Sequence, residues 1–226
     1  MAKKKKRKKN KWLIILIATC LAIMLLMLFS KDIQQLIPSK YYNSTIVKIK
    51  APFYVKRLYE NYNNKVDILA KQFNLPAEYL KALIILESSG NNNIPNRFEK
   101  HVFTELKKVR EGTRKNYENI IQKTIYDASD EALKNLASSW GPFQLMGYKC
   151  VLLEINVSDV RGKDALYWGI KWIDLTYGNY LRQEKYRDAF HIHNTGRPYP
   201  KTGKPFTYDP NYVSNGIKYM KVFSND

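Results

Sequence analysis

The sequence has few of the residues that build disulfide-bonded or metal-bound folds. Its 226 residues include two cysteines and three histidines. Cys20 lies inside an apolar run, so Cys150 has no partner for a disulfide in the rest of the chain. His191 and His193 are two residues apart, a spacing at which helical side chains do not share a face. The sequence therefore predicts a domain stabilised by packing, with no metal site and no cofactor.

Several signatures of other chemistry are also missing. We find no Gly-rich phosphate loop or zinc-ligand spacing, and no serine nucleophile elbow. Acidic residues are scarce as well, with 20 Asp and Glu against 38 Lys and Arg, for a net charge of +18. A surface this basic suits a polyanion, which could be nucleic acid, anionic lipid headgroups or a cell wall rich in carboxylates and phosphates.

The N-terminal segment is typical of a membrane anchor. Residues 3–11 contain eight basic residues, and residues 12–29 form an 18-residue run without a charge. Such a run is about long enough to cross a bilayer as a helix, and the positive-inside rule keeps the basic end in the cytoplasm. A cleaved signal peptide is the alternative, but its apolar region is shorter and ends in a small-x-small site. We expect a cytoplasmic tail at 1–11 and an uncleaved single-pass anchor of the cytoplasmic membrane at 12–30.

The rest of the chain, residues 31–226, is therefore expected outside the cytoplasm. Residues 31–52 resemble a stalk, with two prolines and a short strand candidate at residues 46–49, and a globular domain is expected at 53–226. Apolar spacing of three and four residues predicts a mainly helical, α+β domain with a small β element. The expected helices cover residues 55–73, 77–87, 104–110, 117–125, 131–136, 165–181, 186–193 and 212–222.

Glu87 is the first candidate for chemistry. It follows the apolar stretch 83–86 and precedes Ser88, Ser89 and Gly90. A carboxyl group in an apolar setting has its ionised form disfavoured, so its pKa rises. A carboxylic acid that stays protonated near neutral pH can act as a general acid. The alternative is an ordinary exposed glutamate in a last helical turn, an unfavourable place for negative charge.

Two later segments contribute amide and aromatic groups. Residues 137–147 are expected to form a sharp turn at Gly141 and Pro142, followed by the start of an apolar helix that contains Gln144. A carboxamide both donates and accepts hydrogen bonds, which suits an N-acetylated sugar, although a turn and a packed helix would explain the segment equally. The third segment, residues 189–196, contains His193 and Asn194, which we expect in a turn that lines a groove.

The order of these segments resembles a known group of enzymes. Glu87-Ser88-Ser89-Gly90, then Trp140 to Met146, then His193 to Gly196, then Asn211-Tyr212-Val213 are similar to motifs of the lysozyme-like lytic transglycosylase and goose-type lysozyme superfamily. Residues 98–103 and 137–141 are also similar to elements of the phage endolysin N-acetylmuramidase domain. The resemblance covers roughly residues 75–220. In one position it departs from the usual pattern, because His193 stands where a tyrosine is common.

The resemblance implies a lysozyme-like fold and cleavage of the β-1,4 bond between N-acetylmuramic acid and N-acetylglucosamine in peptidoglycan. It implies that Glu87 is the general acid and base. It also implies contacts with the substrate or the cleft for Ser139, Trp140, Gln144, Met146, His193, Asn194 and Tyr212.

A second carboxylate is less clear from the sequence. Glycosidases commonly use two, and Glu99 is the best second candidate, ahead of Glu105 and Asp127. A buried ion pair would explain Glu99 as well. With a single acid, the C6 hydroxyl of the sugar can attack instead of water, so hydrolysis and 1,6-anhydro transglycosylation both stay open.

Three other functions remain as alternatives. The chain could be a catalytically inactive scaffold that binds peptidoglycan, in or near an envelope-spanning secretion or conjugation machine. It could cleave chitin-like polymers. A membrane-tethered nucleic-acid binder would use the basic charge, but the predicted topology places the domain outside the cytoplasm, so no nucleic-acid partner is expected. The predicted partners are peptidoglycan glycan strands and the membrane.

Overall fold

The computed structural model describes residues 52–62 and 64–224. The predicted tail, anchor and strand candidate lie outside the described residues, which belong to one compact unit. Among the residues that are described, none of the helices has the length and apolar character needed to span a bilayer.

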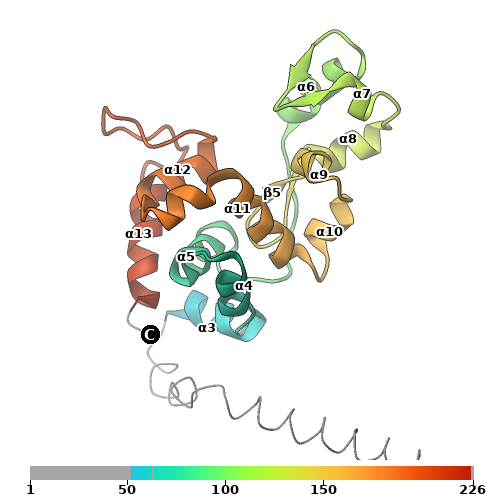
Figure 1. Cartoon of the computed structure of the whole chain (residues 1–226). Coiled ribbons are helices and arrows are strands. Elements are labelled where there is room, and N and C mark those ends of the chain that lie inside the picture. Colours follow the sequence, from blue (N-terminus) through green and yellow to red (C-terminus); the bar gives the residue numbers. More distant parts are fainter. Residues whose placement is uncertain (1–51, 63, 225–226) are drawn as a thin grey trace, which may run out of the picture. The chain divides into compact units, whose positions relative to one another are not determined.

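The described part of the chain is mainly helical with two small sheets (Figure 1). In chain order its elements are α3 (Phe53–Tyr62), α4 (Lys65–Phe73), α5 (Ala77–Ser88), β1 (Arg97–Phe98), α6 (Lys100–Arg110), β2 (Asn116–Tyr117), β3 (Ile120–Ile121), α7 (Gln122–Ile125), α8 (Asp130–Leu136), β4 (Ser138–Trp140), β5 (Leu145–Met146), α9 (Tyr148–Leu153), α10 (Val157–Arg161), α11 (Ala165–Arg182), α12 (Tyr186–Thr195) and α13 (Tyr212–Phe223). One sheet has the order β1-β4-β5 and the other pairs β2 with β3, all antiparallel.

Helix α5 lies at the centre of one group of helices. Leu80, Leu83 and Ile84 are fully buried, and a helix with so many apolar side chains must be covered by neighbours. Those neighbours are α3, α4 and α13, and α13 in turn packs on α12 (Figure 1). The prediction of a helix over residues 77–87 is confirmed. Its last turn, where the candidate acid lies, is therefore held on several sides.

A second core lies between α6, the short hairpin β2–β3 and helices α7 to α9. Leu106, Ile120 and Leu133 are fully buried in it, with Tyr148 at its edge. Helix α11 packs on both α4 and α10 (Figure 1).

Two helix predictions need correction. The pattern over residues 55–73 is divided between α3 and α4, and Asn64 takes the N-cap position of the second helix, a position that asparagine favours. The helix expected over residues 117–125 is mostly a hairpin. Glu118 and Asn119 both have positive φ angles, of 49° and 66°, which closes a two-residue turn between β2 and β3. Only α7 remains helical there.

The helix start expected after Pro142 is also wrong. The chain forms the hairpin β4–β5 instead, with Ser139 opposite Met146 and Trp140 opposite Leu145. Gly141 and Gln144 have positive φ angles of 71° and 47°, so the backbone turns back before a helix can begin. Helix α9 starts only at Tyr148.

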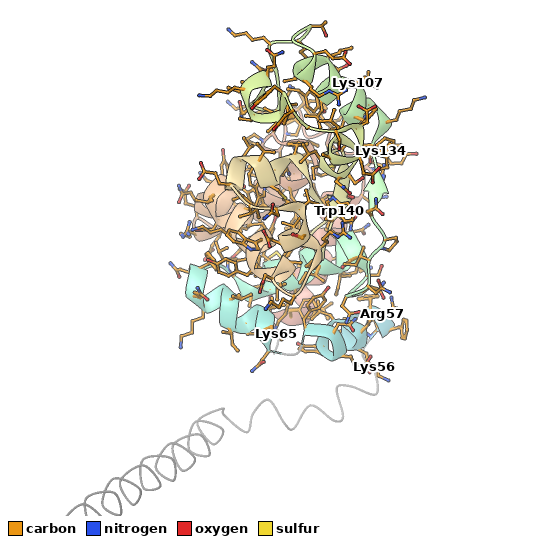
Figure 2. The ribbon with its side chains drawn as sticks, turned by 90° about the vertical axis from the view of Figure 1, so that its right-hand side faces the viewer. Lys56, Arg57, Lys65, Lys107, Lys134 and Trp140 are labelled. Carbon is orange, nitrogen blue, oxygen red and sulfur yellow. The ribbon has the colours of Figure 1, made fainter. Side chains whose placement is uncertain are left out.

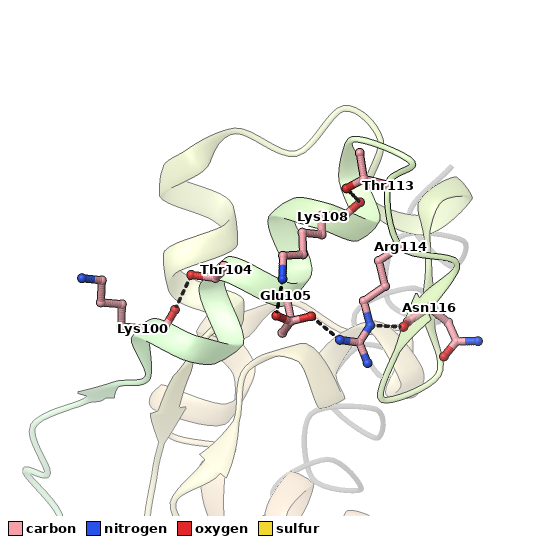
Figure 3. A network of polar contacts seen from close by, with 7 residues as sticks. All are labelled: Lys100, Thr104, Glu105, Lys108, Thr113, Arg114 and Asn116. Atoms are coloured by element: carbon pink, nitrogen blue, oxygen red, sulfur yellow. Dashed lines mark hydrogen bonds and ion pairs between the residues drawn. The ribbon is translucent and has the colours of Figure 1, made fainter.

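Helix α6 and the segment that follows it are joined by a polar network around Glu105 (Figure 3). Its carboxylate accepts a hydrogen bond from Lys108 Nζ at 2.8 Å and another from Arg114, whose Nε donates to the carbonyl of Asn116 at 2.7 Å. The hydrogen bonds from Lys108 and Arg114 hold the pKa of Glu105 below its usual range. Glu105 is therefore an ionised structural group, the opposite of a proton donor.

The turn at Gly141 gives a test of the fold. A Cβ at this residue would lie 2.5 Å from the backbone oxygen of Val160, whereas a Cβ at Gly203, which has a similar φ of 79°, would meet nothing within 4 Å. Gly203→Ala is expected to cost about 1 kcal/mol for the left-handed backbone alone. Gly141→Ala should cost about 1–3 kcal/mol more because the backbone of α10 must move. Urea unfolding of both variants measures the difference, and equal losses would contradict the packing described here.

Candidate active site

Glu87 lies in the last turn of α5, where the chain leaves the helix through Ser89 in a left-handed conformation. Its side chain is 16% exposed, so the carboxyl group is largely withdrawn from water but still reachable. Ile84, in the preceding turn, is fully buried, and the hydroxyl of the next residue, Ser88, donates to the Ile84 carbonyl at 2.7 Å. The carboxyl is therefore largely buried, although the side chains that approach it from other elements are polar.

Two residues from the C-terminal helices approach the carboxyl of Glu87. The hydroxyl of Tyr212, in the first turn of α13, donates a hydrogen bond to Glu87 Oε1. His193 Nε2, near the end of α12, lies 3.7 Å from the same oxygen. Three segments that are far apart in the sequence thus meet at one carboxylate oxygen.

The hydrogen bonds of His193 fix its tautomer. Its Nε2 lies 3.0 Å from the carbonyl oxygen of Phe143, which can only accept, so Nε2 carries the hydrogen. Its Nδ1 accepts from the hydroxyl of Tyr177 at 2.7 Å. Burial, with a smaller contribution from the charge of Lys149, lowers the pKa of His193 to about 3. The ring is neutral at physiological pH, so it does not form a charged pair with Glu87.

The same burial acts on Glu87 in the opposite direction. It raises the pKa of the Glu87 carboxyl from 4.5 to about 7, while the hydrogen bond from Tyr212 and the charges of Lys149 and Arg97 oppose the rise. Burial is the largest contribution because an ionised carboxylate loses more hydration than a neutral acid. A carboxyl group with this pKa exchanges a proton readily near neutral pH, which is the property required of a general acid and base.

Lys149 belongs to this site, although the sequence analysis did not select it. It lies in the first turn of α9, with Nζ 5.1 Å from the centre of the Trp172 ring. Burial lowers the pKa of Lys149 to about 8, and the negative charges of Glu118 and Glu87 oppose this. No local pattern marks this lysine, because only the long-range fold brings its charge within reach of Glu87.

The hairpin β4–β5 holds its own polar groups. The Ser139 hydroxyl donates to Gln144 Oε1 at 2.7 Å, and Gln144 Nε2 donates to the Gly141 carbonyl at 3.1 Å. Trp140 Nε1 donates to the Asn135 carbonyl at 2.9 Å. In the structure these three side chains form hydrogen bonds that stabilise the hairpin. The sugar contacts predicted for Ser139, Trp140 and Gln144 remain predictions.

The remaining predicted residues lie in different surroundings. Met146 in β5 is partly buried against the second core. Asn194 is exposed near the end of α12, and none of the described residues forms a hydrogen bond with its side chain. Glu99 is paired with Arg97, whose Nε lies 2.8 Å from Glu99 Oε1, and its side chain is 25% exposed. Its role as a second carboxylate stays a prediction.

Two surface hollows lie elsewhere, along α12, α13 and the loop between them, and Glu87 lines neither. Among residues 52–62 and 64–224, no three His, Cys, Asp or Glu side chains gather closely enough to form a metal site. The charged side chains of Lys56, Arg57, Lys65, Lys107 and Lys134 project from the surface (Figure 2).

Comparison with known proteins gives one structural likeness. No family model and no curated protein sequence matches the chain. The crystal structure of the Burkholderia AP3 phage endolysin is similar with a TM-score of 0.48 and 17% sequence identity, over 71% of this chain and 70% of that chain.

The buried carboxyl predicts an unusual dependence of stability on pH. Because folding raises the pKa of Glu87 from 4.5 to about 7, its contribution to stability is full below pH 4.5 and is lost as the pH rises through 7. Glutamine cannot ionise, so Glu87→Gln does not lose this stability. Its free energy of unfolding relative to that of wild type should therefore be roughly 3 kcal/mol higher at pH 8 than at pH 4. Urea unfolding at both pH values measures it.

Glu131→Gln is the matched control for charge, since the side chain of Glu131 is 76% exposed. A gain for Glu87→Gln no larger than that of this control would show that the carboxyl is not desolvated.

Proposed function

We propose that this chain is a peptidoglycan glycosidase that cleaves the β-1,4 bond between N-acetylmuramic acid and N-acetylglucosamine. The observation that carries the proposal is the carboxyl of Glu87, whose pKa burial raises to about 7 and which lies beside Tyr212 and neutral His193. The choice of peptidoglycan as the substrate rests on the resemblance of four ordered segments to lysozyme-like enzymes. The basic surface agrees with it, because peptidoglycan and the polymers attached to it are rich in negative charge.

In the proposed reaction, Glu87 gives its proton to the glycosidic oxygen while the bond from that oxygen to C1 of N-acetylmuramic acid breaks. The N-acetylglucosamine portion leaves as an alcohol. The resulting Glu87 carboxylate then takes the proton of the C6 hydroxyl as that oxygen bonds to C1, which closes a 1,6-anhydro ring. The hydrogen bond from Tyr212 stabilises the carboxylate between the two proton transfers.

The charges around Glu87 favour this intramolecular route over hydrolysis. A second carboxylate about 5–10 Å away would be needed for the two-carboxylate mechanisms, and its charge would raise the pKa of the acid further. Among the described residues, the charges that act on the Glu87 carboxyl are the cations Lys149 and Arg97. Glu99 carries its own counterion in Arg97. We therefore propose a lytic transglycosylase, with muramidase hydrolysis through Glu99 as the alternative.

Digestion of purified peptidoglycan by the full chain tests the reaction. Glu87→Gln is isosteric but has no proton to exchange, so we expect activity to fall by at least a hundredfold, in line with the usual contribution of a general acid and base. Glu99→Gln should keep activity within a few fold. Mass spectrometry should find 1,6-anhydro ends, which are one water lighter than reducing ends.

Full activity of Glu87→Gln would instead support an inactive scaffold that binds peptidoglycan. Reducing ends together with loss of activity in Glu99→Gln would show hydrolysis with two carboxylates. Activity on chitin without activity on peptidoglycan would assign a different substrate.

We also propose that the chain is anchored in the cytoplasmic membrane with residues 53–226 outside the cytoplasm, on the basis of the basic run and apolar segment at the N-terminus. The exposed residue Lys115 and residue Asn10 offer a matched pair for thiol labelling. A membrane-impermeant maleimide should label Lys115→Cys in intact protoplasts and Asn10→Cys only after lysis. The reverse pattern would place the domain in the cytoplasm.

A further inference from the structure

Two surface hollows share a wall beside α12, α13 and the loop at residues 197–211 that joins them. The first has a volume of about 300 Å³ and is lined by Arg187, Asp188, Tyr199, Pro200, Lys201 and Gly203. The second has a volume of about 280 Å³ and is lined by Arg187, Tyr199, Pro210, Val213, Ser214 and Ile217. Because Arg187 and Tyr199 line both, the two hollows adjoin, and an extended ligand that crosses these two side chains would reach both.

The loop that forms these walls is held in place by a buried histidine. His191 is fully buried; its Nδ1 donates to the Arg197 carbonyl at 2.6 Å, and its Nε2 accepts from the backbone N–H of Phe206 at 3.0 Å. One side chain thus fixes both ends of the loop. Asp188 accepts a hydrogen bond from the backbone N–H of Tyr199 at 2.9 Å, which fixes the part between them. The hollows are therefore formed before any ligand arrives, which lowers the entropic cost of binding.

The first hollow has the chemistry of an anion site. The Arg187 guanidinium lies 4.1 Å from the centre of the Tyr199 ring, and Lys201 lines the same hollow. Within the described part of the chain, neither cation forms an ion pair. The one carboxylate in the lining, Asp188, accepts a hydrogen bond from the Tyr199 backbone N–H, and its single negative charge leaves the hollow with a net positive charge. Two unpaired cations in one hollow favour a carboxylate or a phosphate.

The second hollow adds an apolar requirement. Pro210, Val213 and Ile217 line it, and the Arg187 side chain forms the boundary with the cationic hollow. A matching ligand places a small apolar group next to an anionic one. A simple phosphate polymer lacks the apolar group, whereas a short peptide of alternating alanine and acidic residues has both. The peptide stems on N-acetylmuramic acid have this composition, with alanine next to glutamate.

We propose that these joined hollows bind the peptide stem of peptidoglycan, with an acidic carboxylate between Arg187 and Lys201 and an alanine methyl group against Val213 and Ile217. Val213 directly follows Tyr212, whose hydroxyl contacts Glu87, so α13 contributes a residue to each of the two sites. The identity of the ligand as a stem rests on the proposed function, whereas the preference for an acidic peptide does not. The stem site makes the enzyme selective for glycan strands that still carry peptides.

Isothermal titration of the full chain with the synthetic stem tripeptide alanine–glutamate–lysine tests the site. The variant Arg187→Gln/Lys201→Gln should bind at least tenfold more weakly than wild type. The matched control Lys218→Gln/Lys221→Gln removes the same charge from exposed positions of α13 and should bind as wild type does. Lys201→Glu, at an exposed loop residue, reverses the charge without disturbing the packing of Arg187 on Tyr199, and should also bind at least tenfold more weakly.

Absence of binding by wild type, or equal binding by Lys201→Glu, would overturn the proposal. Displacement of the tripeptide by inorganic phosphate at equal concentration would assign the hollow to a phosphate polymer and would also overturn it.

Activity separates this proposal from the proposed function. Lys201→Glu should raise KM on intact peptidoglycan and leave KM unchanged on glycan strands stripped of their peptides. If Glu87→Gln keeps full activity while Lys201→Glu still weakens binding of the tripeptide, the proposed function fails and the acidic-peptide site stands. If the wild type cleaves peptidoglycan but does not bind the tripeptide, the stem site fails alone.

Discussion

One carboxyl group is buried in the last turn of a helix whose other side chains are almost all covered, and the chemistry of the molecule depends on that placement. Glu87 is held there because α5 is mostly apolar and is packed against α3, α4 and α13. Burial raises its pKa to about 7, despite a hydrogen bond and two cations that favour the ionised form. The core of the fold and the acidity of the site are thus consequences of the same packing.

The polar groups around this carboxyl balance one another. His193 is kept neutral by burial, so it adds no positive charge that would lower the pKa of Glu87 further. Tyr212 donates a hydrogen bond that a carboxylate accepts, which lets Glu87 give up its proton and regain it. The positive charge of Lys149 favours the ionised form of Glu87. Together these groups keep both protonation states accessible near neutral pH.

Local pattern predicted the helices that carry the site, and order along the chain predicted three residues that meet there. The apolar spacing in α5 and the resemblance of later segments selected Glu87, His193 and Tyr212, which the structure brings together. The hairpin at residues 138–146 was missed because positive φ angles at Gly141 and Gln144 override an apolar pattern that also suits a helix. Lys149 was missed because only long-range packing brings it near Glu87.

A direct titration of the Glu87 carboxyl tests the central claim. NMR of the full chain, with glutamate labelled at the side-chain carboxyl carbon and Glu87→Gln used to assign the signal, follows ionisation with pH. The account predicts a midpoint near 7, and a higher midpoint in Tyr212→Phe, where the hydrogen bond to the carboxylate is lost. A midpoint near the ordinary value of 4.5 would show a hydrated carboxylate and would contradict the assignment of Glu87 as the proton donor.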